Sequence, residues 1–152
     1  MCLKAKAPKA PLAGARIETL NDTVRDNVRE VTFRVTCPDK PSTLRLRISG
    51  GKVFSATVFG ENIQGGRDDW NMRFNLMPQE GLELALKADP SSPLKVNAIE
   101  EHVTLPASLD IPPRPKHIVP EPNTVKRRKP IQSQRTFVVR SFEFPAPANP
   151  AP

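Results

Sequence analysis

The feature that most constrains the fold of this chain is the alternation of apolar and polar residues between positions 70 and 86. Apolar side chains occupy every second position on both sides of a short turn-forming segment, at Trp70, Met72, Phe74 and Leu76 and then at Leu82, Leu84 and Leu86. A period of two is typical of strands that bury one face. Residues 77–81, which contain Pro78 and Gly81, predict a hairpin or a tight corner between the two strands.

The same alternation recurs along most of the chain and predicts an all-β fold. Strands are also expected at residues 15–20, 29–36, 43–48, 53–59, 93–98 and 137–144. In the segment 43–48 the alternation places Leu44, Leu46 and Ile48 on one face and Arg45 and Arg47 on the other. Many short strands at regular spacing favour an antiparallel sandwich or barrel, and we expect an antiparallel β-sandwich of about seven or eight strands.

The connections between these strands follow from turn-forming residues. Asn21-Asp22 predicts a turn, and residues 49–52 predict a tight turn that joins segment 43–48 to a partner strand at 53–59. Residues 60–69 are expected to form a polar loop. Residues 99–105 could contain one helical turn.

The composition divides the chain into a domain with flexible ends. We expect a flexible Ala-, Lys- and Pro-rich lead-in at residues 1–15, a β-sandwich domain at residues 16–144 and a disordered tail at residues 145–152. Within the domain, residues 106–130 are too rich in proline for a sheet interior and are expected to lie extended across its surface. We find no secretory signal and no apolar run of about 18 residues that could span a bilayer.

The net charge of +7 is concentrated in one region of the sequence. Between positions 111 and 140, eight Lys and Arg residues stand against one acidic residue, and the rest of the chain is neutral. The candidate residues for contact with an anionic surface are Arg114, Lys116, Lys126, Arg127, Arg128 and Lys129. Run 126–129 could contact anionic lipid headgroups or a nucleic-acid backbone, could serve as a nuclear address, or could be a solvated loop. No aromatic residue is interleaved with it, so nucleic acid is not the expected partner.

The residues that could bind a metal or perform catalysis are few. His102 and His117 stand in no HExxH or HxD pattern, and His102 after Glu100-Glu101 is expected to lie in a solvated loop and not in a metal site. The sequence therefore predicts no cofactor.

Nucleophilic chemistry has no more support. Cys37 continues an apolar alternation and is expected to be a small core residue, whereas Cys2 stands in the lead-in. Asp68-Asp69 is expected to be a solubilising turn, and Trp70 a core residue. We therefore expect that this chain is not itself an enzyme.

Three segments together resemble one known kind of domain. The first is the tryptophan-led strand at Trp70, followed by the turn Pro-x-Glu-Gly-Leu and the strand Leu-x-Leu-x-Leu. The others are the Pro-rich IPPRPKHIVP at positions 111–120 and the strand TFVVRSFEF at positions 136–144. Over residues 17–144 this order resembles the C-terminal soluble domain of membrane-embedded zinc aminopeptidases, of the endoplasmic-reticulum metallopeptidase and vacuolar membrane protease type, and of their bacterial relatives.

The resemblance implies a non-catalytic accessory domain. Such a domain would lie on the non-cytosolic face of a membrane, periplasmic or lumenal, and would pack against a peptidase domain or membrane segments of the same system. No catalytic residue of the family has a counterpart here, because the metal-ligand set is absent from the sequence. The alternative is a separate binding module that docks on anionic lipid or polymer through its basic segment.

We expect that replacing Lys126, Arg127, Arg128 and Lys129 with Gln abolishes docking of the basic segment on anionic vesicles and leaves the sheets folded. The physical reason is that electrostatic docking depends on these charges and is screened by salt. Vesicle co-sedimentation at increasing ionic strength measures the binding, and circular dichroism checks the fold. Binding that survives both the substitution and high salt would contradict the basic-segment hypothesis.

Overall fold

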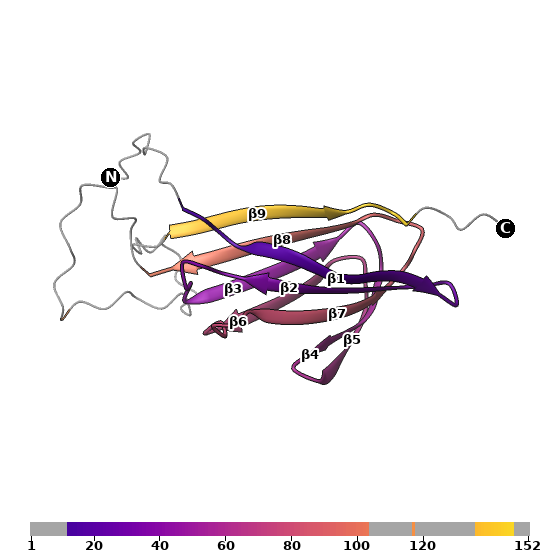
Figure 1. Cartoon of the computed structure of the whole chain (residues 1–152), viewed down its shortest axis with the longest axis horizontal. Helices are drawn as coiled ribbons and strands as arrows, with labels where there is room; N and C mark the ends of the chain where they lie inside the picture. Colours follow the sequence, from indigo (N-terminus) through magenta and orange to yellow (C-terminus); the bar gives the residue numbers. More distant parts are fainter. Residues whose placement is uncertain (1–11, 104–116, 118–135, 148–152) are drawn as a thin grey trace, which may run out of the picture.

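The fold consists of β-strands arranged in two antiparallel sheets that pack together as a β-sandwich (Figure 1). The computed structural model describes residues 12–103, 117 and 136–147. Nine strands are present in these ranges: β1 (Arg16–Arg25), β2 (Val28–Thr36), β3 (Thr43–Ser49), β4 (Val53–Val58), β5 (Glu61–Arg67), β6 (Trp70–Asn75), β7 (Leu82–Ala88), β8 (Leu94–His102) and β9 (Thr136–Phe144). The predicted all-β sandwich is confirmed. No helix that could cross a membrane occurs in the described ranges.

The chain crosses between the two sheets several times. One sheet, called sheet A here, has the order β1-β2-β7-β4-β5, and the other, sheet B, has the order β6-β3-β8-β9. Neighbouring strands in both sheets are antiparallel. The core therefore forms between the inward faces of two sheets, each of which supplies every second side chain.

The buried side chains follow the alternation that the sequence predicted. On β2, β3 and β7 every second residue is buried, and Trp70 begins β6 with 7% of its surface exposed. Phe33 of sheet A meets Phe144 of sheet B with ring centroids 5.5 Å apart. The inference that Trp70 is a core residue is confirmed. Leu76 departs from the pattern, because it follows the end of β6 and is 86% exposed.

Two of the predicted connections have a different form. The turn expected at Asn21-Asp22 is wrong, because β1 continues to Arg25 through a register shift between Thr19 and Asn21. The β1–β2 turn is formed instead by Asp26 and Asn27, both with positive φ (49° and 59°), as the tight turns of hairpins require. Strand β1 is therefore longer than predicted, and its inward phase changes at the bulge.

The expected pairing of segments 43–48 and 53–59 is also wrong. Residues 49–52 connect β3 of sheet B to β4 of sheet A, so the two strands lie in different sheets. Residues 77–81 likewise connect β6 of sheet B to β7 of sheet A, which makes them a corner and not a hairpin. A sandwich allows either connection, and local turn signals do not distinguish them.

Two segments that were not predicted as strands belong to the sheets. The polar loop expected at residues 60–69 contains β5, which pairs with β4 after a turn in which Phe59 and Gly60 have positive φ. The helical turn expected in residues 99–105 is wrong over its described part, because β8 continues to His102 between β3 and β9. In both cases backbone pairing with a neighbouring strand overrides a weak local pattern.

The predicted ends lie mostly outside the described residues. The same is true of the Pro-rich segment 106–130, apart from His117, which is exposed. Residues 12–15, at the end of the predicted lead-in, contact the domain. The amides of Ala13 and Gly14 lie 3.1 and 3.5 Å from Oδ2 of Asp39, and Arg140 donates to the carbonyls of Leu12 and Ala13.

We expect Trp70→Ala to reduce the free energy of unfolding by about 3–5 kcal/mol, because it removes a large buried side chain and leaves a cavity. Chemical denaturation followed by circular dichroism measures the change. The matched control is Leu76→Ala, which removes an exposed side chain from the adjoining segment and should change stability by about 0.5 kcal/mol or less. Equal effects of the two substitutions would show that Trp70 is not part of the core.

Candidate functional site

The outer face of sheet B carries a group of three arginines, which we call the arginine face: Arg45 and Arg47 of β3 and Arg73 of β6. Leu44, Leu46 and Ile48 point into the core, so the alternating positions 45 and 47 point to solvent. The antiparallel register places Arg45 directly opposite Arg73 and Arg47 directly opposite Asn71. Adjacent strands thus bring these arginines together from positions far apart in the sequence.

The positive charge of the arginine face is only partly balanced. Arg47 forms an ion pair of 2.7 Å with Asp69, whereas Arg73 lies 4.0 Å from Glu101 and 3.4 Å from the hydroxyl of Thr43. Arg45 has no hydrogen bond or ion pair with any described residue. Like charges directly opposite one another destabilise a sheet, so the Arg45–Arg73 pair is an unfavourable arrangement unless an anion lies between them.

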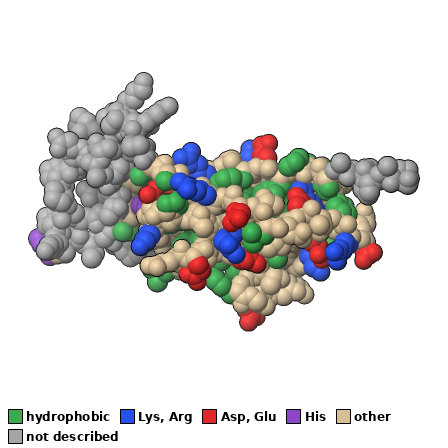
Figure 2. Space-filling model, viewed as in Figure 1, with side chains coloured by type: hydrophobic (Ala, Val, Ile, Leu, Met, Phe, Trp, Pro, Cys, Tyr) green, Lys and Arg blue, Asp and Glu red, His purple; other side chains and the backbone are tan. Residues whose placement is uncertain are grey.

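The outer face of sheet A carries two cations that have acidic partners across the strands. There Arg34 lies 3.3 Å from Glu83 and 4.0 Å from Glu18, and Lys87 lies 3.2 Å from Glu30. The face of the molecule drawn in Figure 2 likewise shows acidic and basic side chains next to one another. Ion pairs across the strands thus balance Arg34 and Lys87 on this face, whereas Arg16 and Arg25 of β1 have no ion pair with a described residue.

Exposed apolar residues adjoin the arginine face. Ile99 of β8 is directly opposite Arg45, and Val139 of β9 is directly opposite Ile99. Val139 and the neighbouring outward residue Phe137 are 58% and 56% exposed. Arginine beside exposed apolar and aromatic side chains is a composition typical of interaction surfaces.

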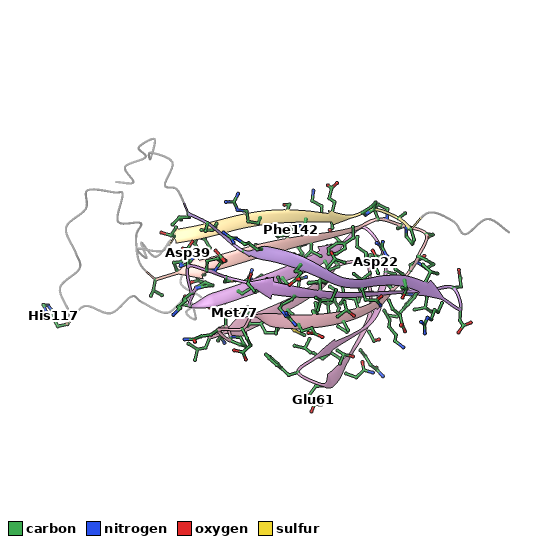
Figure 3. All side chains as sticks on the ribbon, in the orientation of Figure 1. Asp22, Asp39, Glu61, Met77, His117 and Phe142 are labelled. Atoms are coloured by element: carbon green, nitrogen blue, oxygen red, sulfur yellow. The ribbon has the colours of Figure 1, made fainter. Side chains whose placement is uncertain are left out.

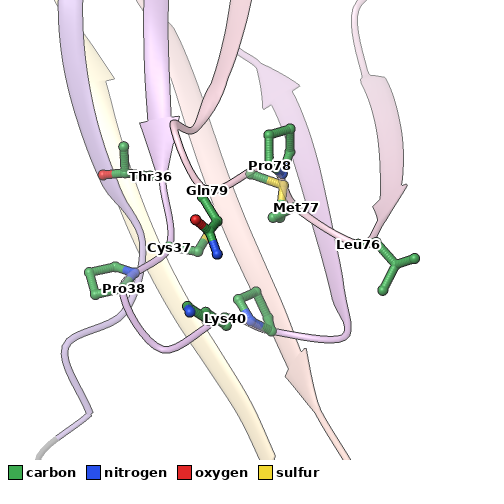
Figure 4. A pocket seen from close by; sticks show the side chains of 9 residues that line it. Thr36, Cys37, Pro38, Lys40, Leu76, Met77, Pro78 and Gln79 are labelled. Carbon is green, nitrogen blue, oxygen red and sulfur yellow. The ribbon is translucent and has the colours of Figure 1, made fainter.

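A second feature is a pocket of about 510 Å³ at one end of the sandwich (Figure 4). It lies between the segment that follows β2 and the corner that follows β6, and it is lined by Thr36, Cys37, Pro38, Lys40, Pro41, Leu76, Met77, Pro78 and Gln79. Its wall is mostly apolar. Figure 3 shows Met77 and Asp39 toward this end and Asp22 nearer the other.

Behind the pocket, Cys37 adjoins a buried carboxylate. Glu100 has no exposed surface, its Oε2 lies 3.4 Å from Nε2 of His102, and its Oε1 has no hydrogen-bond partner. Burial raises the pKa of the Cys37 thiol, and the hydrogen bond and negative charge of Glu100 raise it further. Such a thiol stays protonated near neutral pH, which is the opposite of an activated nucleophile.

The solvated loop expected around His102 is therefore wrong. Side chains at alternate positions of β8 point inward, and Glu100 is the next such position after Ala98. Its carboxylate therefore lies in the interior. Despite the proximity of Cys37, Glu100 and His102, the described residues contain no group of three or more potential ligands that could bind a metal ion. Cys37 is half-buried and packs against the core, as the alternation indicated.

An ion pair on β1 and β2 was not predicted from the sequence. The Arg29 side chain is 1% exposed, and its Nε and Nη2 donate to both carboxylate oxygens of Asp22 at 2.8 and 2.6 Å. Asp22 faces inward because the bulge at Leu20 changes the phase of β1, which places Asp22 opposite Val31. One sequence signal could have placed Arg29 in the core: the alternation of β2 buries every second residue, and Arg29 stands two residues before Val31. This pair joins β1 to β2 at the end of the hairpin, with Arg29 buried and Asp22 partly exposed.

The sequence-predicted contact residues Arg114, Lys116 and the run 126–129 all lie outside the described residues. Asp68 and Asp69 form the turn between β5 and β6, where Asp69 pairs with Arg47. The arginine face was visible in part, because the sequence placed Arg45 and Arg47 on one strand face. Arg73 could not be added without knowing that β6 pairs with β3.

The comparisons with known proteins give no match: no family model, no curated protein and no solved structure matches the chain. The resemblance to the accessory domain of membrane-embedded zinc aminopeptidases therefore stays a prediction. The function has to be argued from the surface of this domain.

We expect Cys37 in a Cys2→Ser background to react with iodoacetamide at pH 8 more slowly in the folded chain than in the chain unfolded in urea. The folded thiol holds its proton because its pKa is raised. Substituting Glu100→Gln should speed the reaction of the folded chain, since it removes a negative charge beside the thiol. Equal rates in the folded and unfolded chains would contradict this account.

The same raised pKa has a consequence for stability. Below the ordinary thiol pKa of 9.0 both folded and unfolded states hold the proton, and above it only the folded state does. The free energy of unfolding should therefore decrease as pH rises past this value, because the unfolded state gains by ionising. Urea titrations between pH 7 and pH 10 measure this, with Cys37→Ala as the control that lacks the dependence.

Proposed function

We propose that this chain is a non-catalytic binding domain, and that its arginine face docks an anionic partner. The observation that carries the proposal is the direct opposition of Arg45 and Arg73, in which Arg73 lies 4.0 Å from Glu101 and Arg45 has no ion pair with a described residue. An anionic group bound between them would convert a destabilising pair into two favourable contacts. The flat sheet and the exposed apolar residues beside it suit a macromolecular partner better than a small molecule.

The chemistry of the described interior supports binding over catalysis. The Cys37 thiol, which lines the end pocket, has a raised pKa, and this works against nucleophilic attack. The ion pair of buried Arg29 with Asp22 is engaged in holding β1 to β2. The guanidinium groups of the arginine face present planar sets of N–H donors, which suit recognition of anions.

The basic run 126–129, with Arg114 and Lys116, remains the alternative docking site. In the sequence, these residues stand between β8, which ends at His102, and β9, which begins at Thr136. Both strands belong to sheet B, which also carries the arginine face. The two hypotheses differ in which cations a partner needs, so separate substitutions distinguish them.

We expect Arg45→Gln/Arg73→Gln to lower the salt concentration at which the protein elutes from an immobilised polyglutamate column. Loss of two charges at the docking site weakens binding, whereas the same loss elsewhere has little effect. The matched control is Arg34→Gln/Lys87→Gln on the outer face of sheet A, where both cations already have acidic partners. Circular dichroism confirms that both variants are folded.

Equal shifts for the two double variants would overturn the arginine-face proposal. A shift confined to a variant with Gln at Lys126, Arg127, Arg128 and Lys129 would place the docking site in the basic run instead. A shift produced by both the arginine-face and basic-run variants would mean that the two act together.

On the resemblance alone, we also propose that this binding serves a membrane-embedded zinc peptidase, to which the chain would be an accessory. Of the motifs quoted for the resemblance, the first forms β6, the corner at residues 77–81 and β7, and the last forms β9. The Pro-rich motif at positions 111–120 lies outside the described residues, apart from His117. Genome sequence next to the start of this reading frame tests the idea. An adjoining or in-frame peptidase with several membrane spans is expected, and an adjacent region with neither would remove the basis for this role.

A further inference from the structure

The four sheet edges of the sandwich differ in how well they are protected from a further strand. Edge strand β1 has a bulge at Leu20, and β5 contains Gly65 and Gly66 and pairs with β4 through another register shift. Edge strand β9 is tied to residues 12–15 through Arg140. Bulges, glycines and covering segments are the usual means by which proteins protect sheet edges.

The fourth edge, β6, has none of these features in the described part of the chain. Its six residues pair with β3 in an unbroken register, and β6 contains neither proline nor glycine. Its pairing is with β3 on one side only, so on the other side no described strand takes up its alternate backbone N–H and C=O groups. Regular, unprotected edges of this kind are sites where extended peptides add to a sheet.

The side chains of β6 specify what such a peptide should contain. On the outer face, Arg73 is half-exposed and stands beside Arg45, so an acidic residue opposite Arg73 would form a cross-strand pair. On the inner face, Met72 and Phe74 pack against the core but are only half-buried. Apolar residues at alternate positions of an added strand would cover them.

We propose that the β6 edge binds an extended acidic peptide segment of a partner protein, which adds as a fifth strand to sheet B with its carboxylates toward Arg73 and Arg45. This inference rests on the proposed function, because it uses the same arginines, and it specifies the partner as an alternating acidic and apolar strand. Main-chain hydrogen bonds to β6 would supply affinity, and the alternation would supply specificity.

A second copy of this chain fits the edge less well. Antiparallel pairing of two β6 strands with matching faces would bring the two Arg73 side chains onto the same outer surface, close to one another. Like charges oppose such pairing. An anionic membrane or a nucleic acid would use the charges of the arginine face but would have no need of the free backbone groups of β6.

The experiment uses the full chain and a fluorescein-labelled peptide of alternating Glu and Val. Fluorescence anisotropy measures binding. Two control peptides have the same sequence: one is N-methylated at alternate residues along one edge of the strand, and the other is N-methylated along the opposite edge. The unmodified peptide should bind. One of the two N-methylated peptides should bind at least about tenfold more weakly, because it cannot complete the main-chain hydrogen bonds.

Charge reversal provides the matched variants. Arg73→Glu should weaken binding of the Glu–Val peptide by about tenfold or more and improve binding of a Lys–Val peptide. Arg34→Glu on sheet A makes the same change of charge and should leave both affinities unchanged. Hydrogen exchange should slow in residues 70–75 on peptide binding and stay unchanged in residues 61–67.

The outcomes separate this inference from the proposed function. If all the peptides bind alike and Arg45→Gln/Arg73→Gln still weakens polyanion binding, the edge inference fails and the arginine face remains a docking site. If that double variant behaves like its sheet A control, both fail. A concentration-dependent dimer in sedimentation that excludes the peptide would assign the edge to a second copy and overturn the peptide proposal.

Discussion

The structure depends on the burial of two alternating apolar faces against one another. Every strand that contributes to the centre of the core presents a side chain inward at each second position, and Phe33 and Phe144 show the two sheets in direct contact. Each buried aliphatic or aromatic side chain contributes about 1.5–3 kcal/mol. The period of two fixes which residues are inside, and it fixes equally which residues face solvent.

The arginine face is a direct consequence of that constraint. Because Leu44 and Leu46 must enter the core, Arg45 must point outward, and because β6 pairs with β3, Arg73 must lie beside it. On sheet A, built by the same rule, Arg34 and Lys87 point outward and pair with acidic residues across the strands. Core packing does not constrain which residues occupy the outward positions. The arrangement of charges on each outer face is therefore evidence about function and not a consequence of the fold.

Where the apolar alternation ends, the inward phase continues and brings charged groups into the interior. Arg29 on β2 and Glu100 on β8 each occupy the inward position next to the last inward apolar residue of the strand, Val31 and Ala98 respectively. Arg29 is balanced by Asp22, which the bulge in β1 turns inward. Glu100 is contacted by His102 through one carboxylate oxygen, and its negative charge also helps to raise the pKa of the Cys37 thiol.

The sequence by itself determined the fold class, the inward residues of the central strands and the core position of Trp70, because the two-residue period is a local property of the chain. It also placed Arg45 and Arg47 on one solvent face. Only the tertiary structure decided that residues 49–52 and 77–81 cross between sheets, that residues 61–67 form an edge strand, and that Arg73 joins the other two arginines. These features depend on which strands become neighbours, and neighbours are selected by burial and backbone pairing over the whole sandwich, which no short segment encodes.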